Sequence, residues 1–516
     1  MKAQIRPQRI ALMFALSVAL IVGYFIVPDY GVSWDEIPIY RHADRTLDAY
    51  QYFFHPEDYA AYDSDTHLNL YGPAHFMLSA ALSRVILALH PTWSLFTAYH
   101  FVYFLSFLFG ALFLYLLATR WMSEWAAFGM TLLFVTQPLF WGNAFINPKD
   151  LPFMTFFIAS LTLGLQMVDD SSNFKWWKIL AAGVVLGVTT SIRLLGPMAG
   201  AFVILYGLWK FPRKTLSILP YYVLITGITT YLTWPYLWKG PVSNFVESLQ
   251  VMYRFPNTGE TLFNGQLYAA NQLPWIYFPT FIVLQLTEPM LILIVTGAAL
   301  SVWFFVTGRN KEPVLLFIFW GLLPALYIGS AESTLYDNAR QLMFLMPPLF
   351  IFAGIGLDAL WERVKTHLLR IALILAIFLP GVYASIQLHP YQYIYFNSLI
   401  GGAGGAFRKF DLDYSGISFK EAQEYINTIA EPGVQIVVIG PRQNARAYAR
   451  PDLKNNFIGT QDFIDPEGLD YYYVLFLTRT NADENRCMDG EIIYTVERDG
   501  GVLAYIRKVI SKERCW

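Results

Sequence analysis

The sequence has little charge and almost no cysteine. Only 14% of its 516 residues are charged, against about 25% in an ordinary soluble domain. The formal net charge is -2 and the basic residues are spread along the chain, so no nucleic-acid-binding surface is indicated. Cys487 and Cys515 are the only cysteines, and their spacing fits neither a zinc site nor a redox motif. They form a disulfide if that end of the chain faces an oxidising compartment, and otherwise remain two free thiols.

Long apolar runs take the place of the missing charge. The chain is 55% hydrophobic and 17% aromatic, which is typical of a multi-span membrane protein and excludes an ordinary soluble enzyme. The first run lacks a small-residue cleavage site and is followed by many similar runs, so we expect it to be retained as a span. The predicted spans are the eleven runs 9–27, 95–118, 121–141, 151–168, 179–192, 195–211, 215–234, 289–306, 314–330, 343–360 and 371–386.

A further apolar stretch, residues 73–90, decides the orientation of everything after it. It carries His75 and Arg84 and is barely long enough to span. If it does not cross, the basic clusters of six alternate connections all fall on one side, which the positive-inside rule assigns to the cytoplasm. We therefore expect residues 73–90 to form a helix at the outer interface, with the N-terminus inside and the C-terminal residues outside. The aromatic segment 273–286 is expected at the same outer surface.

The composition changes near residue 388 to that of a small soluble domain. A helical pattern is followed by strand-like runs and a terminal hairpin, over residues 418–429, 434–439, 471–477 and 491–508. The chain is thus predicted to be an α-helical polytopic membrane protein with a small α/β domain at its end. We expect a transmembrane domain over residues 1–387 and an extracytoplasmic α/β domain over residues 388–516.

Unusual polar residues lie beside several predicted spans. Under the predicted orientation they all meet at the outer membrane boundary, although each has a plain alternative. Asp35 and Glu36 are equally well explained as solvated loop acids. Asp150, which follows Lys149, is also explained as an acid that caps a helix, and Arg193 as a cation that snorkels to the interface. The positions concerned are 35–36 after the first span, 149–150 before the fourth, 193 after the fifth and 332–341 before the tenth.

Carboxylates and cations at a membrane boundary suit the transfer of a group from a lipid-linked phosphate. A carboxylate can take the proton from an acceptor hydroxyl. Arginine and lysine can hold a phosphate anion, arginine through a bidentate fork. Arg193 is especially informative, because an arginine within an apolar run is costly and usually lines a cavity. The apolar spans would hold the lipid tail.

At these residues the chain resembles a known family. It is similar to GT-C class glycosyltransferases of family 39, the protein O-mannosyltransferase type. The resemblance is greatest to the bacterial phospholipid-carrier-dependent members and extends more distantly to lipid A aminoarabinose transferases. It runs nearly end to end, and an ordered set of motifs carries it: Trp34-Asp35-Glu36, Tyr71-Gly72-Pro73, Asn147-Pro148-Lys149-Asp150, Tyr336-Asp337-Asn338-Ala339-Arg340, and the stretch from His389-Pro390 to Asp413-Tyr414.

The resemblance implies a GT-C fold and a role for each motif. Asp35 would be the general base for direct displacement at the anomeric carbon with inversion, and polyprenyl phosphate would be the leaving group. Glu36 is the second catalytic candidate and would orient Asp35 or bind acceptor. The donor phosphate would contact Arg340, Lys149 and Arg193. The remaining candidates, for acceptor or metal, are Asp150, Tyr71, His75, Tyr336 and Asp337.

One motif departs from the family pattern. Relatives often carry a basic residue or a second proline near Tyr71-Gly72-Pro73, where this chain has Ala74-His75. His75 could replace that cation, or it could be a structural histidine. A divalent cation held by Asp35, Glu36 and Asp150 is a further option and no cofactor is certain, since the resemblance implies mannosyltransferases that work without metal. The connection 235–272 is too short for the large inserted domain of the eukaryotic enzymes.

A transporter or flippase of lipid-linked sugars is the rival interpretation. It too would need an apolar groove and phosphate-binding cations. Transporters tend to place ionisable groups near the bilayer midplane and to show two related halves, whereas here the charges gather at one side and no internal repeat is visible. We therefore expect a glycosyltransferase of the bacterial inner membrane with an undecaprenyl- or dolichyl-phosphate type donor. Its acceptor could be a protein, a lipid or another glycan.

Overall fold

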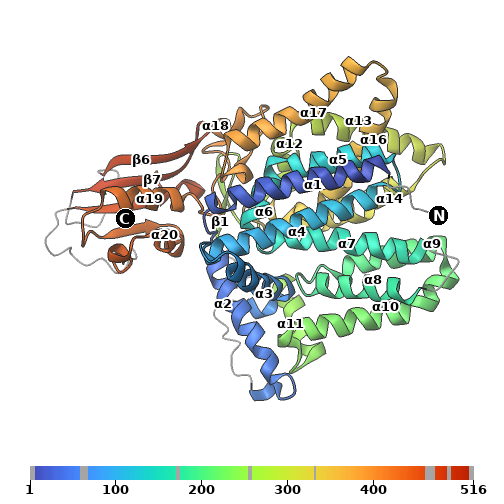
Figure 1. Cartoon of the computed structure of the whole chain (residues 1–516), viewed down its shortest axis with the longest axis horizontal. Coiled ribbons are helices and arrows are strands. Elements are labelled where there is room, and N and C mark those ends of the chain that lie inside the picture. The colour runs from blue at the N-terminus through green and yellow to red at the C-terminus, as the bar shows by residue number, and fades with distance from the viewer. Residues whose placement is uncertain are drawn as a thin grey trace.

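Apolar helices form a bundle, and a small sheet lies beyond one of its ends (Figure 1). The computed structural model describes residues 6–58, 68–169, 175–253, 259–330, 333–458, 471–484 and 490–510. Cys487, Cys515 and Glu332 lie outside the described residues. The start of α1 (Pro7–Ile26) and the strands of the sheet are at opposite ends of the bundle (Figure 1).

All eleven predicted spans are helical. Seven helical stretches in the described ranges are long and apolar enough to cross a membrane, and the other four runs form shorter helices that pack against them. The number of crossings therefore stays a prediction. Besides α1, the helices are α4 (Leu95–Ala118), α5 (Glu124–Thr136), α6 (Pro138–Ile146), α7 (Asp150–Asp169), α8 (Trp176–Thr190), α9 (Pro197–Lys210), α10 (Pro212–Thr233), α13 (Glu288–Val306), α14 (Glu312–Leu316) with α15 (Leu323–Ser330), α16 (Pro347–Arg363) and α17 (His367–Gln387).

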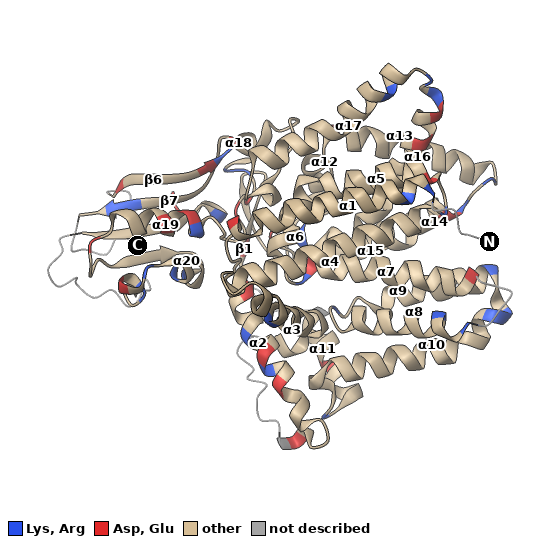
Figure 2. Ribbon diagram, viewed as in Figure 1, with Lys and Arg blue, Asp and Glu red and all other residues tan. Residues whose placement is uncertain are grey.

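The outer helices turn apolar side chains away from the bundle. Helices α4 and α7 are mostly buried, but Phe14 on α1, Val295 on α13 and Leu368 on α17 are each at least 70% exposed. An apolar outer surface of this extent is unfavourable in water and suits lipid. Figure 2 shows Lys, Arg, Asp and Glu mainly toward the two ends of the helices. The protein is therefore an integral membrane protein.

One predicted span is interrupted where it approaches the other polar groups. Helix α5 ends at Thr136 and α6 starts at Pro138, which has no N–H to continue a helix and favours a first helical position. The amide of Gln137 bridges the break, because its Nε2 donates to Thr287 Oγ1 at 2.9 Å and its Oε1 accepts from Thr287 N–H at 3.2 Å. Helix α6 then leads directly into Asn147 and Lys149.

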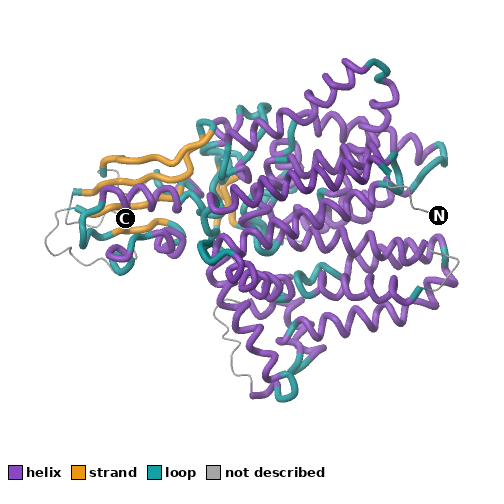
Figure 3. The backbone as a smooth tube through the Cα atoms, viewed as in Figure 1, coloured by secondary structure: helices purple, strands orange, loops and turns teal. Residues whose placement is uncertain are grey.

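Shorter elements cover the end of the bundle that faces the sheet (Figure 3). The stretch 73–90 is helical as predicted, and its place at the membrane interface stays a prediction. These elements are α2 (Glu36–Asp48), α3 (Ala74–Leu89), α11 (Pro241–Tyr253), the hairpin of β1 (Glu260–Phe263) and β2 (Gln266–Ala269), and α12 (Tyr277–Gln285).

The C-terminal sheet has five strands in the order β4-β3-β5-β7-β6. Strand β3 is parallel to β4 and β5, and every residue of β3 and β5 is buried, as expected for strands covered on both faces. The predicted terminal hairpin is confirmed: β6 and β7 are antiparallel, and Asp499 and Gly500 between them have positive φ angles of 50° and 72°. The bounds are β3 (Ile436–Ile439), β4 (Phe457–Ile458), β5 (Tyr472–Leu477), β6 (Glu491–Arg498) and β7 (Gly501–Val509), with helices α19 (Phe419–Ile429) and α20 (Arg442–Tyr448).

Candidate active site

The segment that carries Asp35 leaves α1 and runs along the C-terminal part of the chain. The N–H of Trp34 donates to Ser415 O at 2.9 Å, and Asn444 Nδ2 donates to Val32 O at 2.8 Å. Gly31 is needed for this close approach, because a Cβ there would lie 2.4 Å from the backbone oxygen of Ile417. The segment therefore holds Asp35 at the junction of the bundle and the sheet, with its side chain 27% exposed.

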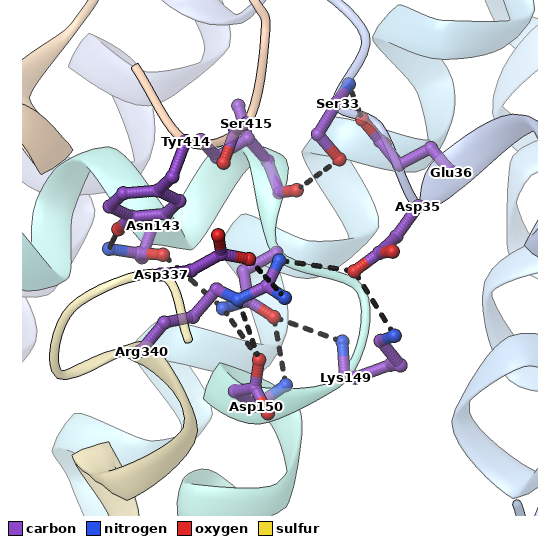
Figure 4. A network of polar contacts seen from close by, with 12 residues as sticks. Ser33, Asp35, Glu36, Asn143, Lys149, Asp150, Asp337, Arg340, Tyr414 and Ser415 are labelled. Carbon is purple, nitrogen blue, oxygen red and sulfur yellow. Dashed lines mark hydrogen bonds and ion pairs between the residues drawn. The ribbon is translucent and has the colours of Figure 1, made fainter. Parts of the chain in front are cut away.

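Two cations meet the carboxylate of Asp35 (Figure 4). Lys149 Nζ and Arg340 Nη1 each lie 3.1 Å from Asp35 Oδ2. Arg340 is itself buried, and its other nitrogens reach Asp337 Oδ2 at 2.9 Å and Asp150 Oδ2 at 3.4 Å. The structure thus brings together, from three distant parts of the sequence, residues that were predicted to converge.

Arg193 completes the cluster from the end of α8. Its guanidinium forms an ion pair with Asp150, which is buried. A buried carboxylate needs this pairing, since an isolated charge in a medium of low dielectric constant is very costly. Arg193 therefore contacts the site and does not simply snorkel toward solvent, and its side chain remains 19% exposed.

The cluster holds Asp35 in its charged form. Burial would raise the pKa of the Asp35 carboxyl, but the positive charges of Lys149 and Arg340 outweigh it and hold the pKa well below the usual range. Burial would likewise lower the pKa of Lys149, but Asp35, together with Tyr71 and Tyr336, more than offsets that effect and raises the pKa. Asp35 and Lys149 are therefore both ionised, and each stabilises the charge of the other.

Asn147 shapes the turn that presents Lys149 and Asp150. Its Oδ1 accepts hydrogen bonds from the N–H groups of Lys149 at 3.1 Å and Asp150 at 2.8 Å, at the start of α7. This is the usual work of a capping side chain. Because Asn147 caps the helix, the carboxylate of Asp150 is free to pair with Arg193 and Arg340. The contacts therefore do not support the interpretation of Asp150 as a capping acid.

Glu36 and His75 point elsewhere. Glu36 is fully buried, accepts from Ser33 N–H at 2.5 Å and from the hydroxyl of Tyr40, and lies 2.9 Å from His100 Nε2. His75 contacts Ser106 Oγ at 2.9 Å. These contacts correspond to a structural histidine at position 75. The Glu36 carboxylate thus contacts Ser33 in the turn that precedes Asp35, and His100, and its expected roles of orienting Asp35 or binding acceptor stay predictions.

Two predicted tyrosines flank the cations. Lys149 Nζ is 5.5 Å from the centre of the Tyr71 ring, and the Arg340 guanidinium is 5.8 Å from that of Tyr336. Both distances are within the range of cation–π attraction. Each ring thus lies against a charge of the cluster.

Arg479 is a site residue that the sequence analysis missed. It follows β5, and its Nη2 lies 2.8 Å from Asp337 Oδ1 while its guanidinium is 5.3 Å from the ring of Trp34. A signal existed, because side chains that follow the carboxyl ends of parallel strands commonly face ligands. The run 471–477 predicts the strand, and Arg479 lies two residues beyond its end.

Two cavities meet at this cluster. The larger, of about 840 Å³, is mainly apolar and also reaches Arg193 and Tyr71. The smaller, of about 510 Å³, lies between the bundle and the sheet and is lined by Asp35, Arg340 and Arg479. Tyr336 lines both. The charged cluster therefore separates an apolar cavity from a polar one.

The acids of the site do not form a metal centre. In the part of the chain that the structure describes, no group of three or more His, Cys, Asp or Glu side chains is arranged to hold a metal ion. Asp35 and Asp150 instead face cations, and Glu36 faces His100.

The apolar bundle, the charged site at its end and the sheet beyond it define the GT-C fold of membrane proteins, and the predicted fold class is confirmed. Two solved structures of ArnT from Cupriavidus metallidurans share this fold. The apo structure has a TM-score of 0.53 and 13% identity and covers 98% of this chain and 100% of that one. The structure bound to undecaprenyl phosphate has a TM-score of 0.52 and 13% identity and covers 96% and 97%. No family model matches the sequence and no curated protein does, so membership of family 39 stays a prediction.

Proposed function

We propose that this protein is a membrane glycosyltransferase that moves a sugar from a polyprenyl-phosphate carrier to a hydroxyl acceptor. The observation that carries the proposal is the meeting of Asp35 with Lys149 and Arg340 at the boundary between an apolar and a polar cavity. One solved structure of the same fold is ArnT bound to undecaprenyl phosphate, which supports a donor of this type.

The apolar cavity suits the carrier. Met198, Phe202 and Leu323 are among its lining residues, and burial of an isoprenoid chain against such side chains contributes about 25 cal/mol per Å² of apolar surface. Arg193 lies at the same cavity. With the chain in the cavity, the phosphate would reach Arg193, Lys149 and Arg340.

Asp35 is the proposed general base. The carboxylate takes the proton of the acceptor hydroxyl while the oxygen attacks the anomeric carbon. The bond from that carbon to the phosphate oxygen breaks, the configuration inverts, and the phosphate leaves with the bonding electrons. Lys149 and Arg340 stabilise the charge that develops on the leaving phosphate.

The ion pairs of Asp35 also explain how this base becomes active. Because its pKa is held low by two cations, the carboxylate is a weak base in the free protein. A bound phosphate also pairs with Lys149 and Arg340. The two cations then stabilise the Asp35 carboxylate less, and the pKa of Asp35 rises. Base strength is thus coupled to donor binding.

The finer proposals follow the sequence analysis. The site would face the outside of a bacterial inner membrane, with the N-terminus in the cytoplasm. The chain would divide into a transmembrane domain over residues 1–387 and an outer domain over residues 388–516. The activity would be that of family 39, the protein O-mannosyltransferase type. The site and the sheet lie at the same end of the bundle, so the proposed outer placement applies to both (Figure 1).

The proposal is tested with the purified full-length protein in liposomes. We expect radiolabelled polyprenyl-phosphate sugars to lose their label to an acceptor, and mass spectrometry of cells with and without the protein to show the modified acceptor. A transporter or flippase would move the labelled donor across the bilayer without consuming it. Intact donor on both sides of the bilayer would therefore overturn the enzymatic proposal.

A further inference from the structure

The polar cavity of about 510 Å³ contains groups that the proposed transfer does not use. It is formed by the turn at Trp34, by the stretch around Asp337, and by residues that follow the carboxyl ends of β3 and β5. Gly440 and Arg479 come from the C-terminal part. The cavity therefore depends on both parts of the chain, and it opens beside Asp35, where an acceptor hydroxyl must arrive.

Trp34 gives the cavity an apolar surface. Its side chain is 43% exposed although it lies next to Asp35 in the sequence. Large exposed aromatic rings combine a broad apolar face with a polar N–H, and they suit ligands that carry C–H groups on one face and hydroxyls at the edge. A pyranose ring has this distribution.

Arg479 supplies donors beside that surface. Its guanidinium lies 5.3 Å from the centre of the Trp34 ring and pairs with Asp337, while its buried Nε has no hydrogen-bond partner among the described residues. Planar carboxylate and guanidinium groups can accept from and donate to neighbouring hydroxyls at the same time. The Arg479–Asp337 pair is therefore suited to a polyhydroxylated ligand.

The charges of the cavity do not favour an anionic acceptor. Three acids line it, namely Asp35, Glu260 and Asp337, against two cations, Arg340 and Arg479. Lys149, 3.1 Å from Asp35, supplies a third positive charge and makes the charges balance. The cavity therefore has no net positive charge to hold an anionic acceptor, and a neutral acceptor needs none.

Strand β5 gives no free edge for a peptide acceptor. It reaches the cavity at Leu477 and is paired with β3 on one side and with β7 on the other. Its backbone groups are therefore used within the sheet, and an extended peptide cannot add to it as a further strand.

We infer that this cavity binds the acceptor as a neutral glycan, with a sugar ring on Trp34 and its hydroxyls on the Arg479–Asp337 pair. The inference deepens the proposed function and rests on it. Arg479 brings the C-terminal domain into acceptor recognition.

The test uses the full-length protein in liposomes with labelled polyprenyl-phosphate sugars extracted from cells. Neutral glycan and protein fractions from cells that lack this protein serve as separate acceptors. We expect the label in the glycan fraction. Trp34→Ala and Arg479→Gln should each raise the glycan concentration that gives half-maximal transfer about tenfold. The donor concentration that gives half-maximal transfer should not change. Trp34→Phe should restore transfer, and Trp275→Ala, which alters a 77% exposed tryptophan outside the cavity, should act as wild type.

A binding measurement separates this inference from the proposed function. Ala482→Cys places a thiol in the cavity wall once Cys487 and Cys515 are replaced by serine. Its labelling by a maleimide should be slowed by the glycan fraction and not by the protein fraction, whether or not transfer occurs. Protection by protein alone, label transferred to protein, or an unchanged Trp34→Ala variant would overturn the inference. Glycan protection without consumption of donor would instead overturn only the enzymatic proposal.

Discussion

Arg340 Nη1 lies 3.1 Å from Asp35 Oδ2, although 305 residues separate the two in the sequence. One follows the first long helix, and the other precedes α16. Lys149 reaches the same oxygen. A proton acceptor and an anion-binding group therefore occupy one site, and the proposed transfer requires both of them there.

Asp35→Asn should abolish transfer. The amide keeps the size of the side chain but cannot take a proton, and loss of a general base costs about 10²- to 10⁴-fold in kcat. Donor binding should persist, because Lys149 and Arg340 remain and lose a competing charge. Sugar transfer and donor binding are measured on the purified variant. Asp44→Asn, which alters a 54% exposed acid on α2, is the matched control, and equal transfer by Asp35→Asn and wild type would remove Asp35 from the base role.

Arg340→Gln should destabilise the fold and weaken donor binding. Arg340 is paired with Asp35, Asp150 and Asp337, so its loss leaves three acids without a shared cation. Removing one partner of a buried ion pair costs about 3–5 kcal/mol. Thermal unfolding in detergent checks this.

The control for Arg340→Gln is Arg84→Gln. Arg84 pairs with Asp44 at the surface with 60% of its side chain exposed, and such pairs contribute about 0–1 kcal/mol. If both variants unfold at the temperature of the wild type, the buried network is not a source of stability.

Lys149→Met should shift the acid limb of the pH profile upward. Two cations hold the pKa of Asp35 below its ordinary value of 3.8, so the wild-type carboxylate is ionised at any higher pH. With Lys149 gone, burial acts against Arg340 alone and the pKa rises. The base is active when deprotonated, so kcat/KM should begin to fall at a higher pH than in wild type. Lys454→Met, at an exposed position, should leave the profile unchanged.

The lowered pKa of Asp35 also determines how the stability of the fold depends on pH. The pKa of Asp35 is lower in the folded than in the unfolded chain, so its ionisation stabilises the fold above about pH 4. This contribution is lost as the pH falls through the folded-state pKa. In Lys149→Met the folded-state pKa is closer to the unfolded one, so the contribution should be smaller and its loss complete at a higher pH, and acid unfolding followed by circular dichroism would register it.

Much of the fold could be predicted from the sequence, because it depends on the lengths of the apolar runs and on the periodicity of the apolar residues. The eleven runs are all helical, and the β-branched runs and the terminal hairpin are found where they were expected. The break at Pro138 was missed, although proline has a known effect on a helix. Apolar residues continue on both sides of Thr136-Gln137-Pro138, so hydropathy alone does not mark the break.

The candidate site could be predicted only in part. Charged groups beside apolar helices indicated Asp35, Lys149, Asp150 and Arg340, because charge is costly there. Side-chain direction does not follow from such a pattern. Glu36 is adjacent to Asp35 in the sequence, but its carboxylate faces His100. Arg479 is distant from Asp337 in the sequence, and only the fold brings the two side chains together.

Asn444→Ala should lower kcat without changing KM for donor. Asn444 Nδ2 donates to Val32 O, and Val32 N–H donates to Tyr448 Oη, both at 2.8 Å. Asn444 contacts neither the acids nor the cations of the cluster in these bonds, so it positions Asp35 through the backbone. A slight misplacement of a catalytic group costs up to about 100-fold. Steady-state kinetics in liposomes distinguish the two parameters, and a change in KM for donor alone would contradict a positioning role.

A cysteine at Asn455 should react with a membrane-impermeant maleimide in intact cells. Asn455 is exposed in the C-terminal part, which lies at the end of the bundle opposite the start of α1 (Figure 1). The basic connections should face the cytoplasm, so the sheet should be outside. Lys365→Cys, in the exposed connection between α16 and α17, should react only after permeabilisation. Both are made after Cys487 and Cys515 are replaced by serine. The reverse labelling pattern would place the site of Asp35 in the cytoplasm, and the acceptor would then have to be a cytoplasmic molecule.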